Sequence, residues 1–234
     1  MQLFQKKTPF CSAVIVAAGS ARRMQGIDKI MAPLNGKPLI WHTVRAFQEH
    51  PDIREILIVT RADLLTEIGQ LCRASEFTKV TAVLVGGETR VDSVLAGVSN
   101  VSRKAKLIAV HDGARPLVSA GIISETVKCA AKTGASAPAI PVKDTVKTAK
   151  NGVVTGTPDR STLFAVQTPQ IFDADLLRAA LENARKKQLA VTDDCSAVEA
   201  MGMRVTLTEG EERNLKITTP MDLSVAKLWM EEAQ

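Results

Sequence analysis

Short apolar runs alternate with longer amphipathic stretches over most of the chain. The short runs are rich in β-branched residues and have the length of buried strands; they cover residues 13–18, 55–59, 80–85, 107–110 and 135–142. The stretches between them carry apolar side chains at helical spacing; they cover residues 38–47, 62–73, 91–98 and 122–130. This alternation predicts an α/β fold, with a Rossmann-like, mostly parallel sheet that has helices on both faces.

The alternation stops after Pro141. Two short β-like runs, residues 143–148 and 153–157, flank Asn151-Gly152, a dipeptide typical of a two-residue hairpin turn. The hairpin is polar and lies between core elements of the chain. It predicts either a protruding β-arm at about residues 142–160 or an ordinary surface hairpin.

The last third of the chain returns to regular elements. Apolar spacing predicts helices at residues 176–184 and 193–201 and a strand at residues 204–207. Thr219 as N-cap with Pro220 after it predicts the start of a final helix. Because the chain shows no repeat, low-complexity tract or long linker, we expect a single domain over residues 1–234, with the arm as an appendage.

Composition excludes several classes of protein. The chain has 30 Lys and Arg against 25 Asp and Glu, a net charge of +5 that suits a phosphate-rich ligand but does not specify one. The basic residues are spread out, Tyr is absent and aromatic residues make up 3%, which argues against a nucleic-acid partner. Four scattered cysteines indicate reduced thiols, and no apolar run has the length of a membrane span. We therefore expect a cytoplasmic protein with no membrane partner.

The loop after the first predicted strand is the first candidate site, because open parallel sheets bind ligands beyond the carboxyl ends of their strands. Ala17, Ala18 and Gly19 are small enough for backbone N–H groups to approach a phosphate chain. Arg23 and Lys29 add two positive charges, although the segment has neither a P-loop nor a dinucleotide-binding pattern. A tight turn with exposed basic residues explains this loop equally well.

Two later loops carry candidate chemistry at the same edge of the sheet. Gly86, Glu88 and Ser93 follow the third strand and fit a base-recognising turn, or a plain Gly-Gly turn before a capped helix. Asp112 ends the fourth strand, where a carboxylate suits Mg²⁺ held jointly with phosphate oxygens. His111 beside it is interpreted as structural rather than as a general base.

Together these segments resemble the 2-C-methyl-D-erythritol 4-phosphate cytidylyltransferases, CTP-using enzymes of non-mevalonate isoprenoid synthesis. The motifs that carry the resemblance are Ala-Ala-Gly-x-x-x-Arg-Met with Lys29 shortly after, Gly-Gly-x-x-Arg-x-x-Ser-Val, and His-Asp-x-Ala-Arg-Pro. The likeness continues through residues 143–147, 168–172, 192–194 and 214–220. It covers nearly the whole chain and fits a bacterial or a plastid origin equally.

The resemblance implies a role for each matched position. Arg23, Lys29 and Lys216 would stabilise the pentacoordinate α-phosphate. The implied nucleotide-binding positions are Ala17, Ala18, Gly19, Gly86, Glu88, Ser93 and Asp112, and Asp112 is also the candidate ligand to Mg²⁺. The implied positions around the methylerythritol phosphate are Arg115, Thr145, Arg160, Thr168 and Thr192. A homodimer assembled through the β-arm is implied as well.

The expected reaction is in-line attack of a polyol phosphate on the α-phosphorus of CTP, with release of pyrophosphate. Because a phosphate monoester is largely dianionic near neutral pH, the attack needs no general base. A ribitol 5-phosphate cytidylyltransferase and a nucleotide-binding regulator without turnover stay open as alternatives. Ala21 and Asp28 differ from the residues that such families often carry, and these differences concern the geometry of the loop.

Overall fold

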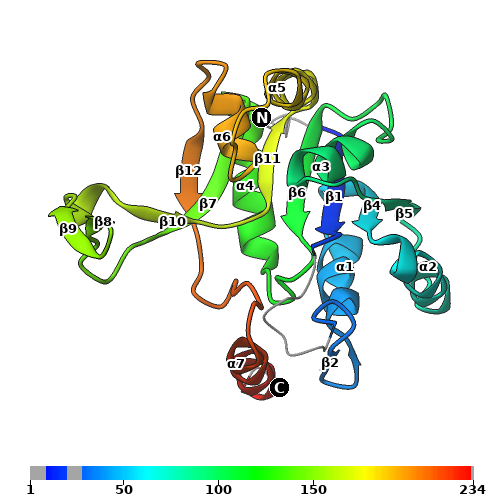
Figure 1. Cartoon of the computed structure of the whole chain (residues 1–234). Helices are drawn as coiled ribbons and strands as arrows, with labels where there is room; N and C mark the ends of the chain where they lie inside the picture. Colours follow the sequence, from blue (N-terminus) through cyan, green and yellow to red (C-terminus); the bar gives the residue numbers. More distant parts are fainter. Residues whose placement is uncertain (1–8, 20–27, 233–234) are drawn as a thin grey trace, which may run out of the picture.

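The computed structural model describes residues 9–19 and 28–232, and these form a layered α/β molecule (Figure 1). Within the described residues, eight strands form one sheet in the order β10–β7–β11–β6–β1–β4–β5, with β12 also paired to β7. The strands of this sheet are β1 (Cys11–Ala17), β4 (Ile53–Thr60), β5 (Val80–Val85), β6 (Leu107–Asp112), β7 (Ala135–Pro141), β10 (Phe164–Val166), β11 (Gln170–Asp173) and β12 (Thr206–Glu209).

The sheet is parallel through its centre. β1 pairs in parallel with β4 and β6, β4 pairs in parallel with β5, and β12 pairs in parallel with β7. β10 and β11 run antiparallel to β7, and β11 also runs antiparallel to β6. The predicted mostly parallel, Rossmann-like sheet is therefore confirmed.

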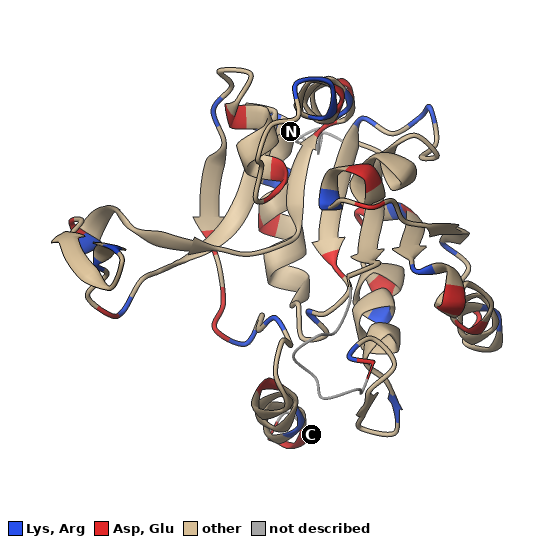
Figure 2. Ribbon diagram, viewed as in Figure 1, with Lys and Arg blue, Asp and Glu red and all other residues tan. Residues whose placement is uncertain are grey.

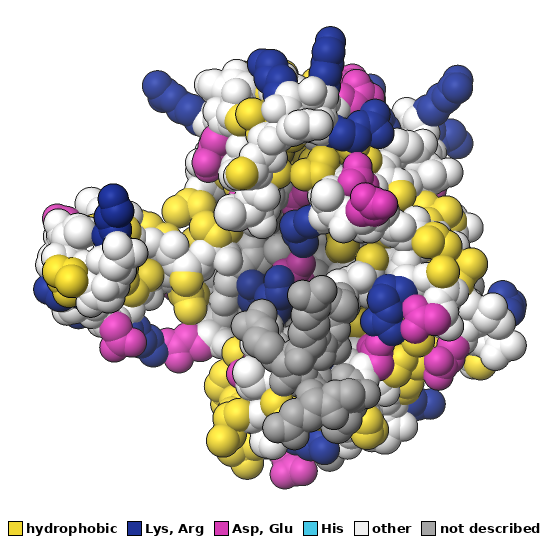
Figure 3. Space-filling view, viewed as in Figure 1, with side chains coloured by type: hydrophobic (Ala, Val, Ile, Leu, Met, Phe, Trp, Pro, Cys, Tyr) yellow, Lys and Arg dark blue, Asp and Glu magenta, His cyan; other side chains and the backbone are white. Residues whose placement is uncertain are grey.

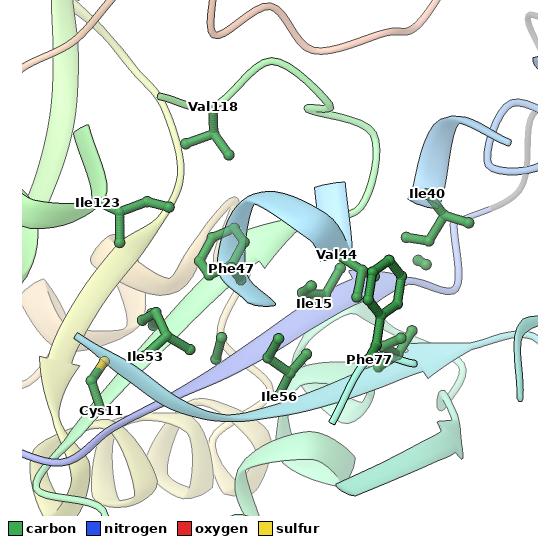
Figure 4. Close-up of a cluster of buried hydrophobic side chains, with 14 of the residues drawn as sticks. Cys11, Ile15, Ile40, Val44, Phe47, Ile53, Ile56, Phe77, Val118 and Ile123 are labelled. Atoms are coloured by element: carbon green, nitrogen blue, oxygen red, sulfur yellow. The ribbon is translucent and has the colours of Figure 1, made fainter. Parts of the chain in front are cut away.

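Helices cover both faces of the sheet, as predicted. The longer helices are α1 (Leu39–Glu49), α2 (Leu65–Ala74), α3 (Arg90–Val98), α4 (Ala120–Thr133), α5 (Ala174–Lys186) and α7 (Pro220–Glu231), and the short α6 spans Asp194–Glu199. Because strand side chains alternate between faces, Ile15 packs with α1, α2 and α4, whereas Val14 packs with α3 and α5. Figure 4 shows the first of these clusters, with Phe47 and Phe77 among the isoleucines of β1 and β4.

The β10–β11 segment was not predicted from the sequence. Val166 of β10 pairs with Ala139 of β7, and Ile171 of β11 pairs with Ser136 of β7. The chain therefore advances five residues from β10 to β11 while β7 advances only three. The two additional residues form a bulge that interrupts both pairing and periodicity, which explains why neither short strand shows an alternating pattern. The bulge contains Thr168 and carries it toward the carboxyl end of β6.

The predicted hairpin is present. β8 (Thr148–Lys150) and β9 (Val153–Gly156) pair in antiparallel orientation around Asn151 and Gly152, whose φ angles are 52° and 79°. Two consecutive positive φ angles are those of a type I′ turn, as the Asn-Gly dipeptide predicts. The first arm strand begins at Thr148 rather than at Lys143, and Figure 1 shows the hairpin reaching away from the sheet. No helix of the described part of the chain is long and apolar enough to cross a membrane.

Candidate active site

A cleft of about 510 Å³ opens beyond the carboxyl ends of β1, β5 and β6. Its described lining residues are Val16, Ala17, Ala18, Gly19, Lys29, Ile30, Gly87, Glu88, Thr89, Arg90, Ser93, Asp112, Ala114 and Lys216. Figure 2 shows the acidic end of β6 at this edge, and Figure 3 shows basic and acidic side chains together in the central hollow of the same face. The fold therefore brings together the three loops in which the sequence placed candidate chemistry.

The loops after β1 and β5 meet at their glycines and alanines. A Cβ atom added to Gly86 would lie 2.6 Å from the Cβ atom of Ala18 and 2.8 Å from Oγ of Ser93. Glycine is needed at this position because the two loops approach more closely than any side chain allows. The predicted phosphate cradle and the predicted base-recognising turn are thus adjacent walls of one cleft.

Ser93 lies one turn into α3, where Thr89 caps the helix in a capping box with Asp92. The hydroxyl of Ser93 donates a hydrogen bond to the backbone oxygen of Thr89 at 3.0 Å. This bond fixes the serine side chain against its own helix, and the side chain still lines the cleft. Glu88 lines the same wall and carries a carboxylate at its rim.

Asp112 is the centre of a charged cluster in the floor of the cleft. Its Oδ1 accepts a hydrogen bond from Nη1 of Arg90 at 3.0 Å, and its Oδ2 lies 2.8 Å from Nζ of Lys216 and 3.7 Å from Nε of Arg115. Burial by itself would raise the pKa of Asp112, but the charges of Arg90, Lys216 and Arg115 outweigh burial and lower that pKa well below its usual range. The carboxylate is therefore ionised at any physiological pH.

His111 has the opposite environment to its neighbour. Its side chain is fully buried, Nε2 donates to the backbone oxygen of Arg115 at 3.2 Å, and Nδ1 accepts from the hydroxyl of Thr168 at 3.1 Å. Burial, together with the nearby charges of Arg115 and Lys216, lowers the pKa of His111 to about 3. A neutral imidazole with both nitrogens bonded inside the protein is a structural residue, as the sequence interpretation had it.

Thr168 and Arg115 connect this floor to the C-terminal part of the chain. The Thr168 hydroxyl accepts a hydrogen bond from the backbone N–H of Asp112 at 3.1 Å, and Arg115 Nη1 donates to the backbone oxygen of Asn214 at 2.5 Å. Both side chains therefore organise the segment around Asp112. Arg115 itself is largely buried behind the cleft.

Asn214 and Gln167 hold Lys216 in place and were not identified from the sequence. The side-chain amide of Asn214 is fully buried and donates to Gln167 Oε1 at 3.1 Å and to the backbone oxygen of Thr168 at 2.9 Å. Three residues later, next to Lys216, the backbone N–H of Ile217 donates to the backbone oxygen of Ala114 at 2.8 Å. The only sequence signal for this role is that Asn214 opens the last segment of the family resemblance.

Arg90 and Asp194 were also missed as site residues. Arg90 Nη2 donates to Asp194 Oδ2 at 2.7 Å while Nη1 contacts Asp112, so one guanidinium bridges two carboxylates. Arg90 is the arginine of the Gly-Gly-x-x-Arg motif, which is the signal that could have identified it. Nothing in a single sequence pairs it with a residue 104 positions away.

The other residues predicted in the loop after β1 are Lys29, Arg23, Ala21 and Asp28. Lys29 lines the cleft beside Gly19, whereas Arg23 and Ala21 lie outside the described residues. Asp28, next to Lys29, forms an ion pair with Arg61 at 2.5 Å.

None of the five predicted substrate positions is among the described residues that line the cleft; Arg115 and Thr168 are largely buried beside Asp112, and the other three are exposed. The described residues that line the cleft do not include Thr145, Arg160 or Thr192. Thr145 is exposed at the base of the arm, and Arg160 Nη1 donates to the backbone oxygen of Lys143 at 2.8 Å nearby. Thr192 is exposed just before α6, where its backbone N–H donates to Oγ of Ser196 at 3.1 Å.

The cleft fits a metal ion that arrives with phosphates better than a resident one. Among residues 9–19 and 28–232, no group of three or more His, Cys, Asp or Glu side chains is placed to hold a metal. Mg²⁺ in proteins is commonly held by one or two carboxylates together with substrate phosphates. Asp112 is an ionised carboxylate beside the backbone cradle, so this donor set fits the second arrangement.

Comparisons with known proteins identify the family of the chain. Residues 11–232 match the family model for 2-C-methyl-D-erythritol 4-phosphate cytidylyltransferase. The protein of that name from Caldanaerobacter subterraneus is 43% identical over 223 residues, which cover 94% of this chain and 98% of that protein. The one from Symbiobacterium thermophilum is also 43% identical over 223 residues, with coverage of 94% and 93%.

Solved structures give the same result. The 4-diphosphocytidyl-2C-methyl-D-erythritol synthase from Anaerococcus prevotii superposes with a TM-score of 0.85 at 29% identity, covering 96% of this chain and 97% of that one. The 2-C-methyl-D-erythritol 4-phosphate cytidylyltransferase from Thermus thermophilus gives a TM-score of 0.77 at 32% identity, covering 93% and 98%. The chain belongs to the 2-C-methyl-D-erythritol 4-phosphate cytidylyltransferase family.

Proposed function

We propose that the cleft transfers a cytidylyl group from CTP to 2-C-methyl-D-erythritol 4-phosphate, giving 4-diphosphocytidyl-2-C-methyl-D-erythritol and pyrophosphate. The observation that carries the proposal is the pairing of Lys216 with Asp112 beside the cradle of Ala17, Ala18 and Gly19. A cradle of backbone N–H groups next to lysine side chains suits the joining of two phosphate groups, because both neutralise phosphate charge. The chain is thus a nucleotidyltransferase of non-mevalonate isoprenoid synthesis.

The reaction consists of two anions brought into line. A phosphate oxygen of the polyol substrate forms a bond to the α-phosphorus of CTP, and the bond from that phosphorus to the pyrophosphate oxygen breaks. Lys29 and Lys216, with Arg23, neutralise the charge that accumulates on the α-phosphate. His111 takes no part, because it is neutral and buried and the attacking phosphate is already ionised.

Lys216 is suited to follow the charge as it develops. Its side chain is 43% exposed, whereas the carboxylate that it contacts is 10% exposed and held from three sides. The ammonium can therefore leave Asp112 for the phosphate, while Asp112 stays in place. Gly87, Glu88 and Ser93 line the wall that receives the cytosine, and Gly86 lets this wall approach Ala18 closely.

A divalent cation, Mg²⁺ in our proposal, would be held by Asp112 together with the phosphates of CTP. When bound there, it supplies further neutralisation of the triphosphate charge. Lys29 and Lys216 would flank the same phosphates, so the lysine side chains and the ion would together neutralise the triphosphate charge.

The polyol phosphate binds between two copies of the chain in this proposal. Thr145 and Arg160 lie at the base of the arm and do not line the cleft of their own chain, so an arm from a partner subunit would supply them. Val153, Val154 and Phe164 on and beside the arm are 68%, 56% and 46% exposed, which suits a protein contact. Thr168 and Arg115 are bonded to the segment around Asp112, so they would come from the chain that binds CTP. Thr192, before α6, is proposed as a contact to the same substrate.

The four cysteines are unpaired, and the relatives are bacterial proteins, which supports a cytoplasmic location for the activity. Family membership disfavours the ribitol 5-phosphate reaction, and the intact Asp112–Lys216 pair disfavours a regulator that has lost turnover. We therefore retain the methylerythritol reaction as the function.

The experiment that tests this function measures pyrophosphate release from CTP and 2-C-methyl-D-erythritol 4-phosphate in magnesium buffer. Replacement Lys216→Ala is expected to lower kcat roughly 100-fold or more, with a much smaller change in the KM for CTP, because its charge acts on the transition state. The matched control is Lys227→Ala, an exposed lysine on α7 that should leave kcat unchanged. Near-wild-type turnover of Lys216→Ala would contradict the assigned role.

A further inference from the structure

Arg90 connects the floor of the cleft to a second, buried carboxylate. It is the first residue of α3, and its two terminal nitrogens contact Asp112 on β6 and Asp194 on α6, at 3.0 and 2.7 Å. The side chain of Asp194 is 2% exposed, whereas that of Arg90 is 29% exposed and lines the cleft. The arginine therefore lies between a fully enclosed carboxylate, with which it forms an ion pair, and a space that we assign to CTP.

The position of Asp194 is fixed by the backbone around it. Asp193 caps α6, and Gln170 Oε1 accepts hydrogen bonds from the backbone N–H groups of Asp194 and Cys195 at 3.0 and 3.1 Å. Cys195 and Val198 bury the same short helix against the core. The carboxylate of Asp194 thus cannot follow Arg90 if the arginine moves, and its own burial makes loss of the ion pair costly.

Arg90 has a competing partner once a nucleotide is bound. A guanidinium binds a polyphosphate in the same two-pronged manner in which it binds carboxylates. If only Asp112 held Arg90, a triphosphate in the cleft would compete with Asp112 for the arginine. Because Lys216 also moves to the phosphate in our proposal, Asp112 would then lose both cations. A second carboxylate on the far side of Arg90 opposes that transfer.

We infer that Asp194 is a positioning residue for cytidylyl transfer, whose fixed negative charge keeps Arg90 on Asp112 and off the triphosphate. This inference rests on the proposed function of the cleft. It explains why an acidic residue is buried on α6, outside the described lining of the cleft, and why both terminal nitrogens of Arg90 contact carboxylates although Arg90 lines the cleft.

The test compares steady-state kinetics of Asp194→Asn with wild type. Asparagine keeps the size of the side chain and one accepting oxygen but removes the charge. We expect kcat to fall at least about tenfold, while the KM for CTP stays the same or falls, because a released Arg90 adds a contact to the triphosphate. The matched control is Asp175→Asn, a 96% exposed carboxylate on α5 that should change neither constant.

A double substitution separates positioning from a general loss of structure. Lysine at position 90 keeps a positive charge but cannot present two parallel donors. In an Arg90→Lys background, Asp194→Asn should change kcat less than about twofold, because the link through which it acts is already broken. Fully additive effects, an unchanged kcat in Asp194→Asn, or a KM for CTP that rises with the fall in kcat would each overturn the inference.

Two further readouts keep the test decisive. Should Asp194→Asn be insoluble, Arg90→Lys alone must show the lower kcat at unchanged KM, and normal turnover of that variant overturns the inference. Calorimetric titration of CTP in magnesium buffer does not depend on turnover. An inactive wild type would refute the proposed function. The inference would then depend on CTP binding alone: Asp194→Asn should bind CTP as tightly as wild type does, and binding that is weaker by more than about threefold would overturn the inference.

Discussion

His111 and Asp112 are adjacent in the sequence and ionise in opposite directions. Both are buried, but the carboxylate faces Arg90 and Lys216 across the cleft floor, whereas the imidazole turns into the protein toward Thr168. Burial without an opposite charge favours a neutral histidine, and burial with three cations favours an ionised aspartate. The charge of the site is therefore set by which side of β6 each side chain faces.

This difference predicts a pH dependence of stability that depends on His111. Its pKa is about 3 in the folded protein against an ordinary 6.5, so between these values the unfolded chain binds more protons than the folded one. The free energy of unfolding must therefore decrease as the pH falls through this window. Between pH 7 and pH 5, wild type should lose about 2 kcal/mol more than His111→Gln.

Urea denaturation of wild type and His111→Gln at pH 7 and pH 5 measures these free energies of unfolding. His42 and His50 titrate in both proteins, so their contributions cancel in the comparison. Glutamine can replace both hydrogen bonds of the ring without taking up a proton in this range. If the free energy of unfolding changed equally with pH in the two proteins, His111 would take up its proton as readily in the folded as in the unfolded state. That result would contradict a buried, neutral His111.

Sequence motifs led to candidate residues that share one cleft, whereas residues that are joined only in space were not proposed from the sequence. Asp112 and the Ala17–Gly19 cradle were proposed because they follow predicted strand ends, whereas Lys216 was proposed only from the family resemblance; all of them line one cleft. The Arg90–Asp194 pair and the Asn214–Gln167 contact join positions 104 and 47 residues apart. Such pairings depend on the packing of α6 and on the β10–β11 bulge, and no local pattern records them.

At the scale of elements, strands β8 and β9 pair with each other and are exposed along nearly their whole length. The turn between them was predicted by Asn151 and Gly152, because positive φ is a local requirement. Strands β10 and β11 were missed because a bulge breaks their alternation. Local chemistry thus predicts turns and capped helices such as α7, whereas short strands that depend on partners for their pairing are not visible in the sequence.

The arm leads to a prediction about assembly. Val153 and Val154 are exposed on β9, so Val153→Asp with Val154→Asp should cost the folded monomer little, within about 0.5 kcal/mol. If the arm packs on a second subunit, two buried charges there should shift the protein from dimer to monomer in sedimentation velocity experiments.

Met221→Asp is the control for this pair, because Met221 is 71% exposed on α7, away from the arm. That variant should sediment as wild type does. A doubly substituted arm that still sediments as a dimer, or a wild type that is monomeric at micromolar concentration, would contradict assembly through the arm.

At the scale of the whole molecule, the parallel sheet explains why three separate loops make one site. β1 and β6 are neighbours, and β4 lies between β1 and β5, so the carboxyl ends of these parallel strands share one edge. The alternating pattern of the sequence predicted this sheet, and with it the edge at which ligands bind. It could not predict how Lys216 reaches that edge from a segment more than 100 residues downstream of β6.

In our proposal, the cleft as a whole couples CTP to 2-C-methyl-D-erythritol 4-phosphate. The most direct measurement supplies purified protein with CTP, magnesium and either that substrate or ribitol 5-phosphate, and follows pyrophosphate release. We predict turnover with the methylerythritol phosphate and at most a trace with ribitol 5-phosphate. Turnover with ribitol 5-phosphate alone, or with neither substrate, would contradict the account.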